Sequence, residues 1–385
     1  MPLSEDIKSL AHEAGFHAVG ITSAEPFLES EQALKDRYDR GLLEGSGYDP
    51  EVIRLYTHPQ ETLVTARSIV SVALSYLSDE SNESYGSYGP GGWMARFSRG
   101  LDYHQVLQER MFVLAGDIRA KLGGHAEIRS FADTGPIADR SVAIRAGLGS
   151  HGKNTCVYIT SPFGRGFNSL PNKSWSSWVV LGELLTDIEL ELDDPAPLDI
   201  CGECDECMKA CPTGAICEPY VVDVKICLSQ VTQSKGFIPH GLREKMGTRI
   251  YGCDTCQDAC PLNRDATPGN IENFRPYKGL GANAELLPLI NITPQEFEAR
   301  VKPTTAGWIR RTRFRRNVAV ALGNTGDPIA VPHLIEALSD PEPVIRGHAA
   351  WALGKIGGAR QALESALARE TDPQAADEIR IGLEA

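Results

Sequence analysis

The feature that most constrains this chain of 385 residues is its cysteine pattern, because all but one of its ten cysteines lie between Asp199 and Pro261. The run that begins at Cys201 reads CGECDECMKACP, which is C-x2-C-x2-C-x3-C-P. A second run, CDTCQDACP, repeats this pattern with Ile250 in the place of its first cysteine, and the isolated Cys227 can replace that ligand. This spacing is typical of segments that hold two 4Fe-4S clusters, in which the cysteine before each proline binds the cluster of the other run.

Two such clusters require eight thiolates, and this segment provides them. The crossed arrangement predicts the following ligands: Cys201, Cys204, Cys207 and Cys260 for one cluster, and Cys211, Cys227, Cys253 and Cys256 for the other. Zinc sites use C-x2-C pairs but need neither a third cysteine at the same interval nor the C-P ending. Disulfides require an oxidising compartment, and the sequence shows no export signal. The remaining Cys156 and Cys217 are expected to be ordinary buried thiols.

Composition and charge limit the class of protein. The hydrophobic fraction of 42% and the charged fraction of 23% are those of a globular protein with two or three domains. No apolar run approaches the ~20 residues needed to span a bilayer, and the acidic N-terminus leads into an amphipathic helix rather than a signal peptide. We therefore expect a cytoplasmic protein without membrane contact. The net charge of -13 argues against general affinity for nucleic acid.

The first half of the chain alternates between helical and strand-like patterns. Helices are predicted within 4–24, over 102–122 and over 136–146, and strands from residue 17, over 68–77, 126–131, 155–160 and 177–186. This order predicts an α/β domain over residues 1–195, with a mixed sheet and flanking helices. Residues 78–92 are Ser-, Gly- and Tyr-rich without a period, and we expect a long loop of the kind that forms lids or binding segments.

The segment Gly147–Asn154, GLGSHGKN, satisfies G-x-G-x-x-G and nearly satisfies the phosphate-binding P-loop. Both motifs require a strand before the loop and a helix after it. Here a predicted helix precedes the loop and a strand follows it. We therefore expect a glycine-rich pocket wall or a plain helix C-terminus.

The remaining chain divides into two predicted parts. A ferredoxin-type domain with two clusters is expected over 196–265, and a linker with a HEAT-like repeat domain over 266–385. NVAVALGNTG from Asn317 recurs as HAAWALGKIG from His348, and an apolar helix follows each copy, over 331–338 and 360–367. Stacked helix pairs of this kind are HEAT-type architecture, and two copies alone must pack against the rest of the protein.

Every charged residue between Arg300 and Arg316 is basic, and Trp308 and Phe314 are interleaved. Such a cluster in an acidic chain is a candidate contact for a polyanion, because guanidinium groups bind phosphates and aromatic rings stack on unpaired bases. RNA is favoured over duplex DNA, since no DNA-reading motif is present. The alternative is a solvated helix face that pairs with the protein's own carboxylates. The candidate nucleic-acid contacts are Arg310, Arg311, Arg313, Arg315 and Arg316.

Two clusters alone make an electron carrier, but the α/β domain suggests a second redox cofactor that receives the electrons. Asp133, in FADTGP, follows a strand and precedes a helix, which is where α/β sites lie. A reductase also needs a proton donor, and an Asp must be desolvated to hold its proton at neutral pH. The alternative is that Asp133 caps the helix that begins near Pro136. A D-x-H-x-x-G cobalamin signature starts at Asp102 but has Leu107 in place of its glycine.

In the order FADTGP, GLGSHGKN, CGECDECMKACPTGAI, CLSQVTQSKGF, RIYGCDTCQDACPLN and a HEAT-like tail, the sequence resembles epoxyqueuosine reductases over essentially its whole length. The resemblance implies a cytoplasmic oxidoreductase with two 4Fe-4S clusters and base-off cobalamin. Such an enzyme reduces the epoxide of epoxyqueuosine at the wobble position of tRNA to give queuosine. The implied partners are the tRNA anticodon stem-loop and an external low-potential electron donor of flavodoxin or ferredoxin type.

The resemblance also implies roles for individual residues. Asp133 matches the proton donor, and the eight cysteines match the cluster ligands. The implied cobalamin contacts are Arg96, Val157, Ser229, Lys235, Asp254 and Thr255. The basic cluster and the repeats would hold the anticodon stem-loop.

Two other classes of function stay open at this point. A reductive dehalogenase-like small-molecule reductase would use the same cofactors, although those proteins typically carry an export signal and lack a basic tail. A non-catalytic iron–sulfur electron-transfer protein or tRNA-binding adaptor would hold clusters without a corrin.

Overall fold

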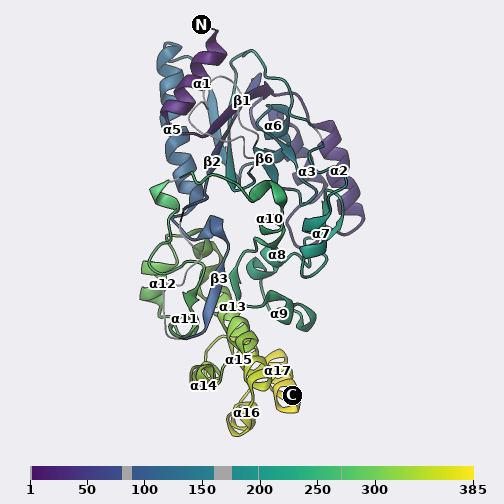
Figure 1. The fold of residues 1–385 in the computed structure, drawn as a ribbon, viewed down its shortest axis with the longest axis vertical. Coiled ribbons are helices and arrows are strands. Elements are labelled where there is room, and N and C mark those ends of the chain that lie inside the picture. Colours follow the sequence, from purple (N-terminus) through teal and green to yellow (C-terminus); the bar gives the residue numbers. More distant parts are fainter. Residues whose placement is uncertain (1, 80–88, 160–175, 198, 270) are drawn as a thin grey trace. The chain divides into compact units, whose positions relative to one another are not determined.

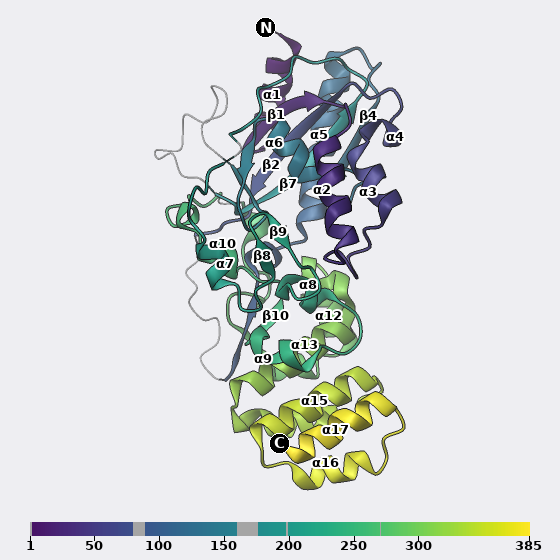
Figure 2. The same cartoon turned by 90° about the vertical axis from the view of Figure 1, so that its right-hand side faces the viewer.

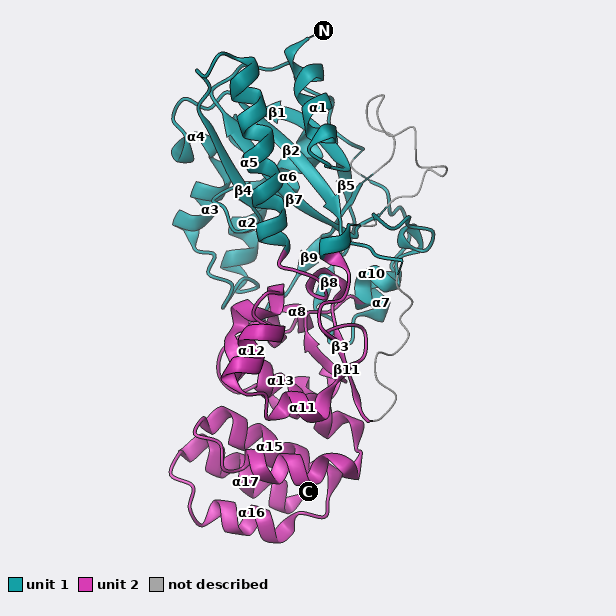
Figure 3. Cartoon of the chain, turned by 90° about the vertical axis from the view of Figure 1, so that its left-hand side faces the viewer, with its two compact units in different colours: residues 1–79, 103–225, 255–273 teal, residues 80–102, 226–254, 274–385 magenta. Residues whose placement is uncertain are grey.

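The computed structural model describes the chain except for residues 1, 80–88, 160–175, 198 and 270. The chain forms two compact units, each built from segments far apart in the sequence (Figure 3). Unit 1 comprises residues 1–79, 103–225 and 255–273, and unit 2 comprises residues 80–102, 226–254 and 274–385. Residues 226–254 of the predicted cluster domain thus belong to unit 2, and its other residues belong to unit 1. Most of the predicted loop 78–92 lies outside the described residues.

A four-stranded sheet forms the centre of unit 1 (Figure 1). Its strand order is β1 (Ala18–Ser23), β2 (Ser68–Ser75), β7 (Val179–Thr186) and β4 (Ile128–Ala132). The α/β architecture is confirmed, but every pairing in this sheet is antiparallel rather than mixed. Helices cover both faces, which explains why every residue of β2 is buried.

The two faces of the sheet are distinguished by alternating residues of β7. Gly182 faces α5 (Tyr103–Lys121), because a Cβ there would lie 2.8 Å from Sδ of Met111. Leu185 faces the opposite side and packs with Val142 of α6 (Asp139–Arg145). Since side chains alternate along a strand, Glu183 projects toward α6 as well.

The other elements of unit 1 surround this sheet. They are α1 (Leu3–Glu13), α2 (Leu28–Asp39), α3 (Pro50–Thr57), α4 (Pro59–Thr62), β5 (Gly149–His151), β6 (Val157–Ile159), α7 (Glu206–Ala210), β8 (Ile216–Glu218), β9 (Val221–Val222) and α10 (Thr255–Asp258). The glycine-rich segment ends α6, since the amides of Gly147 and Leu148 donate to carbonyls of its last turn and Gly147 has a φ of 75°. An antiparallel β5–β6 hairpin follows. The expected helix C-terminus is therefore confirmed.

Unit 2 combines a small sheet with helices (Figure 2). In the sheet, β3 (Gly91–Met94) pairs in parallel with β10 (Arg249–Tyr251) and antiparallel with β11 (Ala284–Glu285). The helices are α8 (Leu228–Gln233), α9 (His240–Met246), α11 (Leu286–Ile290), α12 (Pro294–Arg300), α13 (Arg310–Thr325), α14 (Val331–Ala337), α15 (Pro343–Ile356), α16 (Arg360–Leu367) and α17 (Pro373–Glu384). Within the described part of the chain, no helix has the length and apolar character needed to cross a membrane.

The repeat has a steric basis in two glycines that are 31 residues apart in sequence, Gly323 and Gly354. A Cβ on Gly323 would lie 2.8 Å from Cα of Ala352, so α13 and α15 approach closely there. A Cβ on Gly354 would lie 2.6 Å from Cα of Gly382 in α17. Each glycine therefore lets the next helix of the stack approach the helix that carries it.

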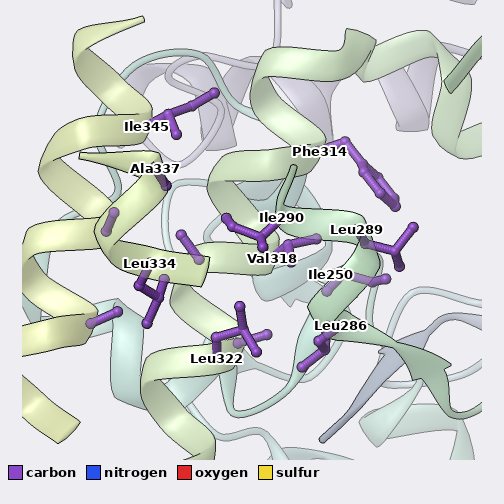
Figure 4. Close-up of a cluster of buried hydrophobic side chains, with 14 of the residues drawn as sticks. Ile250, Leu286, Leu289, Ile290, Phe314, Val318, Leu322, Leu334, Ala337 and Ile345 are labelled. Atoms are coloured by element: carbon purple, nitrogen blue, oxygen red, sulfur yellow. The ribbon is translucent and has the colours of Figure 1, made fainter. Parts of the chain in front are cut away.

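The repeats share a core with the segment before them. Phe314, Val318 and Leu322 of α13 lie in one buried cluster with Leu289 of α11 and Ile250 of β10 (Figure 4). The predicted linker therefore contributes helices to this core. The expectation that two repeat copies pack against other parts of the protein is confirmed.

Candidate functional site

Asp133 lies just after β4, in a turn where its φ of 57° is left-handed, a conformation that Asp tolerates better than most residues. Its carboxylate Oδ2 accepts a hydrogen bond from the hydroxyl of Tyr103 and lies 3.6 Å from Nε2 of His104. The side chain is 53% exposed. It does not cap the next helix, because α6 begins at Asp139 and its N-cap residue makes no side-chain cap. The capping alternative is therefore wrong.

A cavity of about 190 Å³ opens beside Asp133 within unit 1. Its lining residues are Tyr76, Tyr103, Asp133, Asp139, Arg140, Thr155, Cys156, Val157, Ser177, Val179, Val180, Leu181 and Gln257. Gln257 belongs to α10, which also contains the predicted cluster ligand Cys256, the residue directly before it. Its side-chain Oε1 accepts a hydrogen bond from Ser177 Oγ at 2.8 Å. The segment between two predicted cluster ligands thus forms part of the cavity wall.

The pKa values of the carboxyl groups near this cavity shift in opposite directions. Desolvation raises the pKa of Asp133, but hydrogen bonds with His104 and Tyr103 outweigh it, and the net shift is downward. Burial, together with the charge of Asp133, raises the pKa of Asp139 to about 8. Burial and the neighbouring Asp139 raise the pKa of Glu183 well above its ordinary value. Asp133 is therefore ionised at neutral pH, contrary to the expected desolvated acid, whereas the Asp139–Glu183 pair retains a proton there.

The six predicted cluster ligands of unit 1 lie around two short helices, α7 and α10. Burial and the thiols of Cys256, Cys201 and Cys260 raise the pKa of Cys207 to about 11, so these sulfurs lie close together. Cys211 Sγ accepts a hydrogen bond from the amide of Ala215 at 3.2 Å, as sulfur ligands of iron–sulfur clusters commonly do. Such converging thiols repel one another once ionised, and a cationic iron cluster fits them.

The geometry differs from that of a single-ion site. Among the described residues, no group of three or more His, Cys, Asp or Glu side chains could hold one metal ion. A cubane does not need such a group, because each of its thiolates binds a different iron. The two other predicted ligands, Cys227 and Cys253, belong to unit 2.

The remaining thiols were expected to be buried, and this prediction is wrong. Cys217 is exposed, because it lies on the short β8 strand at the surface. Cys156 is partly exposed and lines the cavity.

The predicted cobalamin contacts are distributed over both units. Val157 lines the cavity of unit 1, and Thr255 begins α10. In unit 2 the amide of Arg96 donates to Oδ2 of Asp254 at 2.8 Å, and the Asp254 side chain is 1% exposed. The other two unit 2 residues are Ser229 in α8 and the exposed Lys235. Within unit 2, the structure thus brings Arg96 and Asp254 together.

The basic cluster divides into a buried part and a surface part. Arg316 is fully buried and donates to the carbonyl oxygens of Ser234 and Gly236 at 2.7 and 2.8 Å. Arg315 is 4% exposed and pairs with Asp340 at 2.5 Å. Neither guanidinium can reach a phosphate, because α13 is enclosed on all sides along this stretch. The predicted nucleic-acid role of Arg315 and Arg316 is therefore not supported.

The surface part consists of Arg310, Arg311 and Arg313 beside Trp308. Trp308 is 61% exposed, and the Arg313 guanidinium lies 5.4 Å from the centre of its ring. The Trp308 indole nitrogen donates to Oε1 of Gln233 at 2.9 Å, which fixes the ring. This aromatic and cationic surface retains the chemistry expected of an RNA contact.

Family models match three stretches of the chain. Residues 57–134 match "Epoxyqueuosine reductase QueG, DUF1730", residues 200–263 match a "4Fe-4S double cluster binding domain", and residues 310–384 match HEAT repeats. The epoxyqueuosine reductase of Bacillus anthracis is 38% identical over 99% of this chain and 97% of its own length. That of Escherichia coli K12 is 36% identical over 92% of this chain and 89% of its own length.

Solved structures agree with these relatives. A crystal structure of epoxyqueuosine reductase with an epoxyqueuosine-modified tRNA-Tyr stem loop aligns with a TM-score of 0.90 and 36% identity over 99% of this chain and 98% of that one. A structure of the Bacillus subtilis enzyme, whose aspartate-bearing catalytic loop is swung out of its active site, aligns with a TM-score of 0.89 and 36% identity, with the same coverage.

Proposed function

The chain belongs to the epoxyqueuosine reductase family, and from this premise we propose that it reduces the epoxide of epoxyqueuosine in tRNA to queuosine, with Asp133 delivering the proton. One observation carries the proposal. The cavity beside Asp133 is also lined by Gln257, the neighbour of cluster ligand Cys256. A carboxylate that can transfer protons and a segment that binds a cluster therefore border the same cavity. A reductase requires both at one site, whereas an electron carrier needs only the cluster.

The protein's own groups prepare Asp133 for this role. Tyr103 and His104 hold its carboxylate at the cavity wall, and the backbone of Asp133 is left-handed there. The aspartate-bearing catalytic loop named for the Bacillus subtilis structure supports the same assignment. Asp133 would protonate the epoxide oxygen as its carbon–oxygen bond breaks.

The cofactors follow from the donor groups. The double cluster motif binds iron–sulfur clusters, with the ligand pairs assigned from the cysteine spacing. Base-off cobalamin would supply low-potential reducing equivalents next to the substrate. Val157 at the cavity and the Arg96–Asp254 pair, with Ser229, Lys235 and Thr255, are its proposed contacts. A buried carboxylate held by a backbone amide suits a corrin amide side chain as hydrogen-bond partner.

The proposed partners are a tRNA anticodon stem-loop and an external electron donor of flavodoxin or ferredoxin type, which places the reaction in the cytoplasm. The stem loop in the similar crystal structure supports the first of these. On this chain we assign its backbone contacts to Arg310, which is exposed, and to Arg311 and Arg313, which are half-buried and each donate from Nη1 to a backbone carbonyl. Trp308 provides an adjacent stacking surface.

Deleting the gene should leave epoxyqueuosine in place of queuosine in the bacterial tRNA, and the chain expressed from a plasmid should restore queuosine. Nucleoside analysis of digested tRNA by liquid chromatography and mass spectrometry measures both. An unchanged queuosine content in the deletion strain would favour the small-molecule reductase, and loss of both nucleosides would point to an earlier step.

Anaerobically purified protein should contain about eight iron and eight sulfide per chain. Replacing the predicted ligand Cys207 by serine should lower both to about four, because one cluster loses a thiolate. Cys217→Ser is the matched control, since this exposed cysteine is not a predicted ligand, and its iron content should equal that of the wild type. Zinc in the wild type, or equal iron loss in both variants, contradicts the two-cluster assignment.

A further inference from the structure

The epoxide reduction proposed above requires more than one proton per turnover, and the present inference rests on that proposed function. Converting an epoxide to an alkene consumes two electrons and two protons and releases one water. A single carboxylic acid provides one proton per turnover unless it is reloaded. Asp133 is ionised at rest because Tyr103 and His104 stabilise its charge. The site therefore needs a second proton-holding group that can reach Asp133.

Two carboxyl groups outside the predicted site meet this need. Glu183 lies in the middle of β7 with a side chain that is 0% exposed, and it projects toward α6. Neither of its carboxyl oxygens has a hydrogen-bond partner among the described residues, and the neighbouring Asp139 raises its pKa further. Asp139, the first residue of α6, lies beside Glu183, and its Oδ1 is likewise buried without a hydrogen-bond partner among those residues. The pair is enclosed on the Glu183 side and borders the cavity on the Asp139 side.

The surroundings of the pair favour a shared proton. The charged neighbours are Asp133 and Arg140, and the phenols of Tyr48 and Tyr56 lie near it. Arg140 is exposed, and its Nη1 donates to Oγ1 and to the carbonyl oxygen of Thr155, at 3.1 and 3.2 Å, rather than to either acid. Two adjacent buried carboxylates cannot both ionise without a cation between them.

We propose that the Asp139–Glu183 pair is the proton store of this site and reloads Asp133 during turnover. Asp139 and Asp133 line the same cavity, which at about 190 Å³ has room for bridging water. In each turnover Asp133 takes the proton of the pair and gives it to the epoxide oxygen, and a second proton follows the same route to convert the resulting hydroxyl group to water. The two electrons come from the external donor through the clusters, and solvent reprotonates the pair.

The test uses the reconstituted holoprotein and the variant Glu183→Gln, which preserves shape but removes the shared proton. Infrared spectroscopy without substrate should show the C=O stretch of a neutral carboxylic acid in the wild type at pH 7. Because burial raises the pKa of Asp139 to about 8, this band should weaken as the pH rises through that value, and any band that remains reports Glu183, whose pKa burial also raises. The variant should lack the band, since the Gln amide can donate to an ionised Asp139. Glu29→Gln, an exposed site, is the matched control and should keep it.

Single-turnover reduction of an epoxyqueuosine stem-loop gives the second readout. The wild-type rate should fall above pH 8, and Glu183→Gln should be slower by about tenfold or more at pH 7 without that alkaline decline. The conservative variant Glu183→Asp restores a carboxyl group and should recover both the band and part of the rate. If the wild type reduces the epoxide and Glu183→Gln does so at an unchanged rate, the proton store is wrong. If the wild type reduces no epoxide, the proposed function fails first.

Discussion

Asp133→Asn should lower the single-turnover rate of epoxide reduction by about 10²–10⁴-fold, the usual contribution of a general acid. The amide keeps the shape of the carboxylate, and its oxygen can still accept the hydrogen bond from Tyr103. Asn also tolerates the left-handed backbone at this position. The variant therefore loses the transferable proton without losing the turn that positions the side chain. Queuosine formed from an epoxyqueuosine stem-loop, measured by mass spectrometry, gives the rate.

The controls separate chemistry from folding. Asp39→Asn carries the same chemical change on the exposed end of α2 and should react at the wild-type rate. Asp133→Asn should match the wild type in iron content, in the absorption of bound cobalamin and in melting temperature. Retention of the wild-type rate in this variant would remove Asp133 from the mechanism, and equal loss in both variants would show a general effect of charge.

Local elements of the fold could be predicted because their determinants are local. SIVSVALS in β2 is rich in Val, Ile and Ala and carries no charge, and it forms a strand buried on both faces. The end of α6 at Gly147 follows from glycine's access to positive φ. The division into units could not be predicted, since it depends on contacts between distant segments. Ile250 of β10 joins the core of α13, and no local pattern marks that pairing.

The sequence predicted Asp133 as a site residue, but it did not predict the residues that surround Asp133. Tyr103 and His104 lie at the start of α5. In the sequence they belong only to an incomplete cobalamin signature, and nothing in the pattern indicates that they contact Asp133. Glu183 carried a usable signal, because it is the one charged residue of the otherwise apolar strand VVLGELLT. A buried acid in a central strand needs a partner or a proton, and periodicity alone does not report it.

For the basic cluster, the sequence predicted more nucleic-acid contacts than the structure allows. The number of charges in a segment does not indicate which side chains face solvent. Arg310, at the start of α13, is exposed. Arg316 lies nearly two turns further along, where the helix is enclosed, and its guanidinium binds backbone carbonyls of residues 231–236. These carbonyls lie at the end of α8 and in the loop after it, on the C-terminal side of the predicted ligand Cys227. Arg316 is therefore a structural residue for the loop after this ligand.

Arg316→Met should lower the free energy of unfolding by about 3–5 kcal/mol, because several buried carbonyl oxygens lose their donor and cannot reach water. Arg310→Met should change it by less than about 0.5 kcal/mol, as expected for an exposed side chain. Denaturant titration of the holoprotein followed by circular dichroism measures both.

The affinity for a stem-loop RNA should be affected in the opposite way. Arg310→Met should weaken binding more than Arg316→Met does and should flatten its salt dependence, because one phosphate contact is lost. Equal stability of the two variants would contradict the structural role of Arg316, and unchanged RNA affinity of Arg310→Met would remove Arg310 from the proposed tRNA surface.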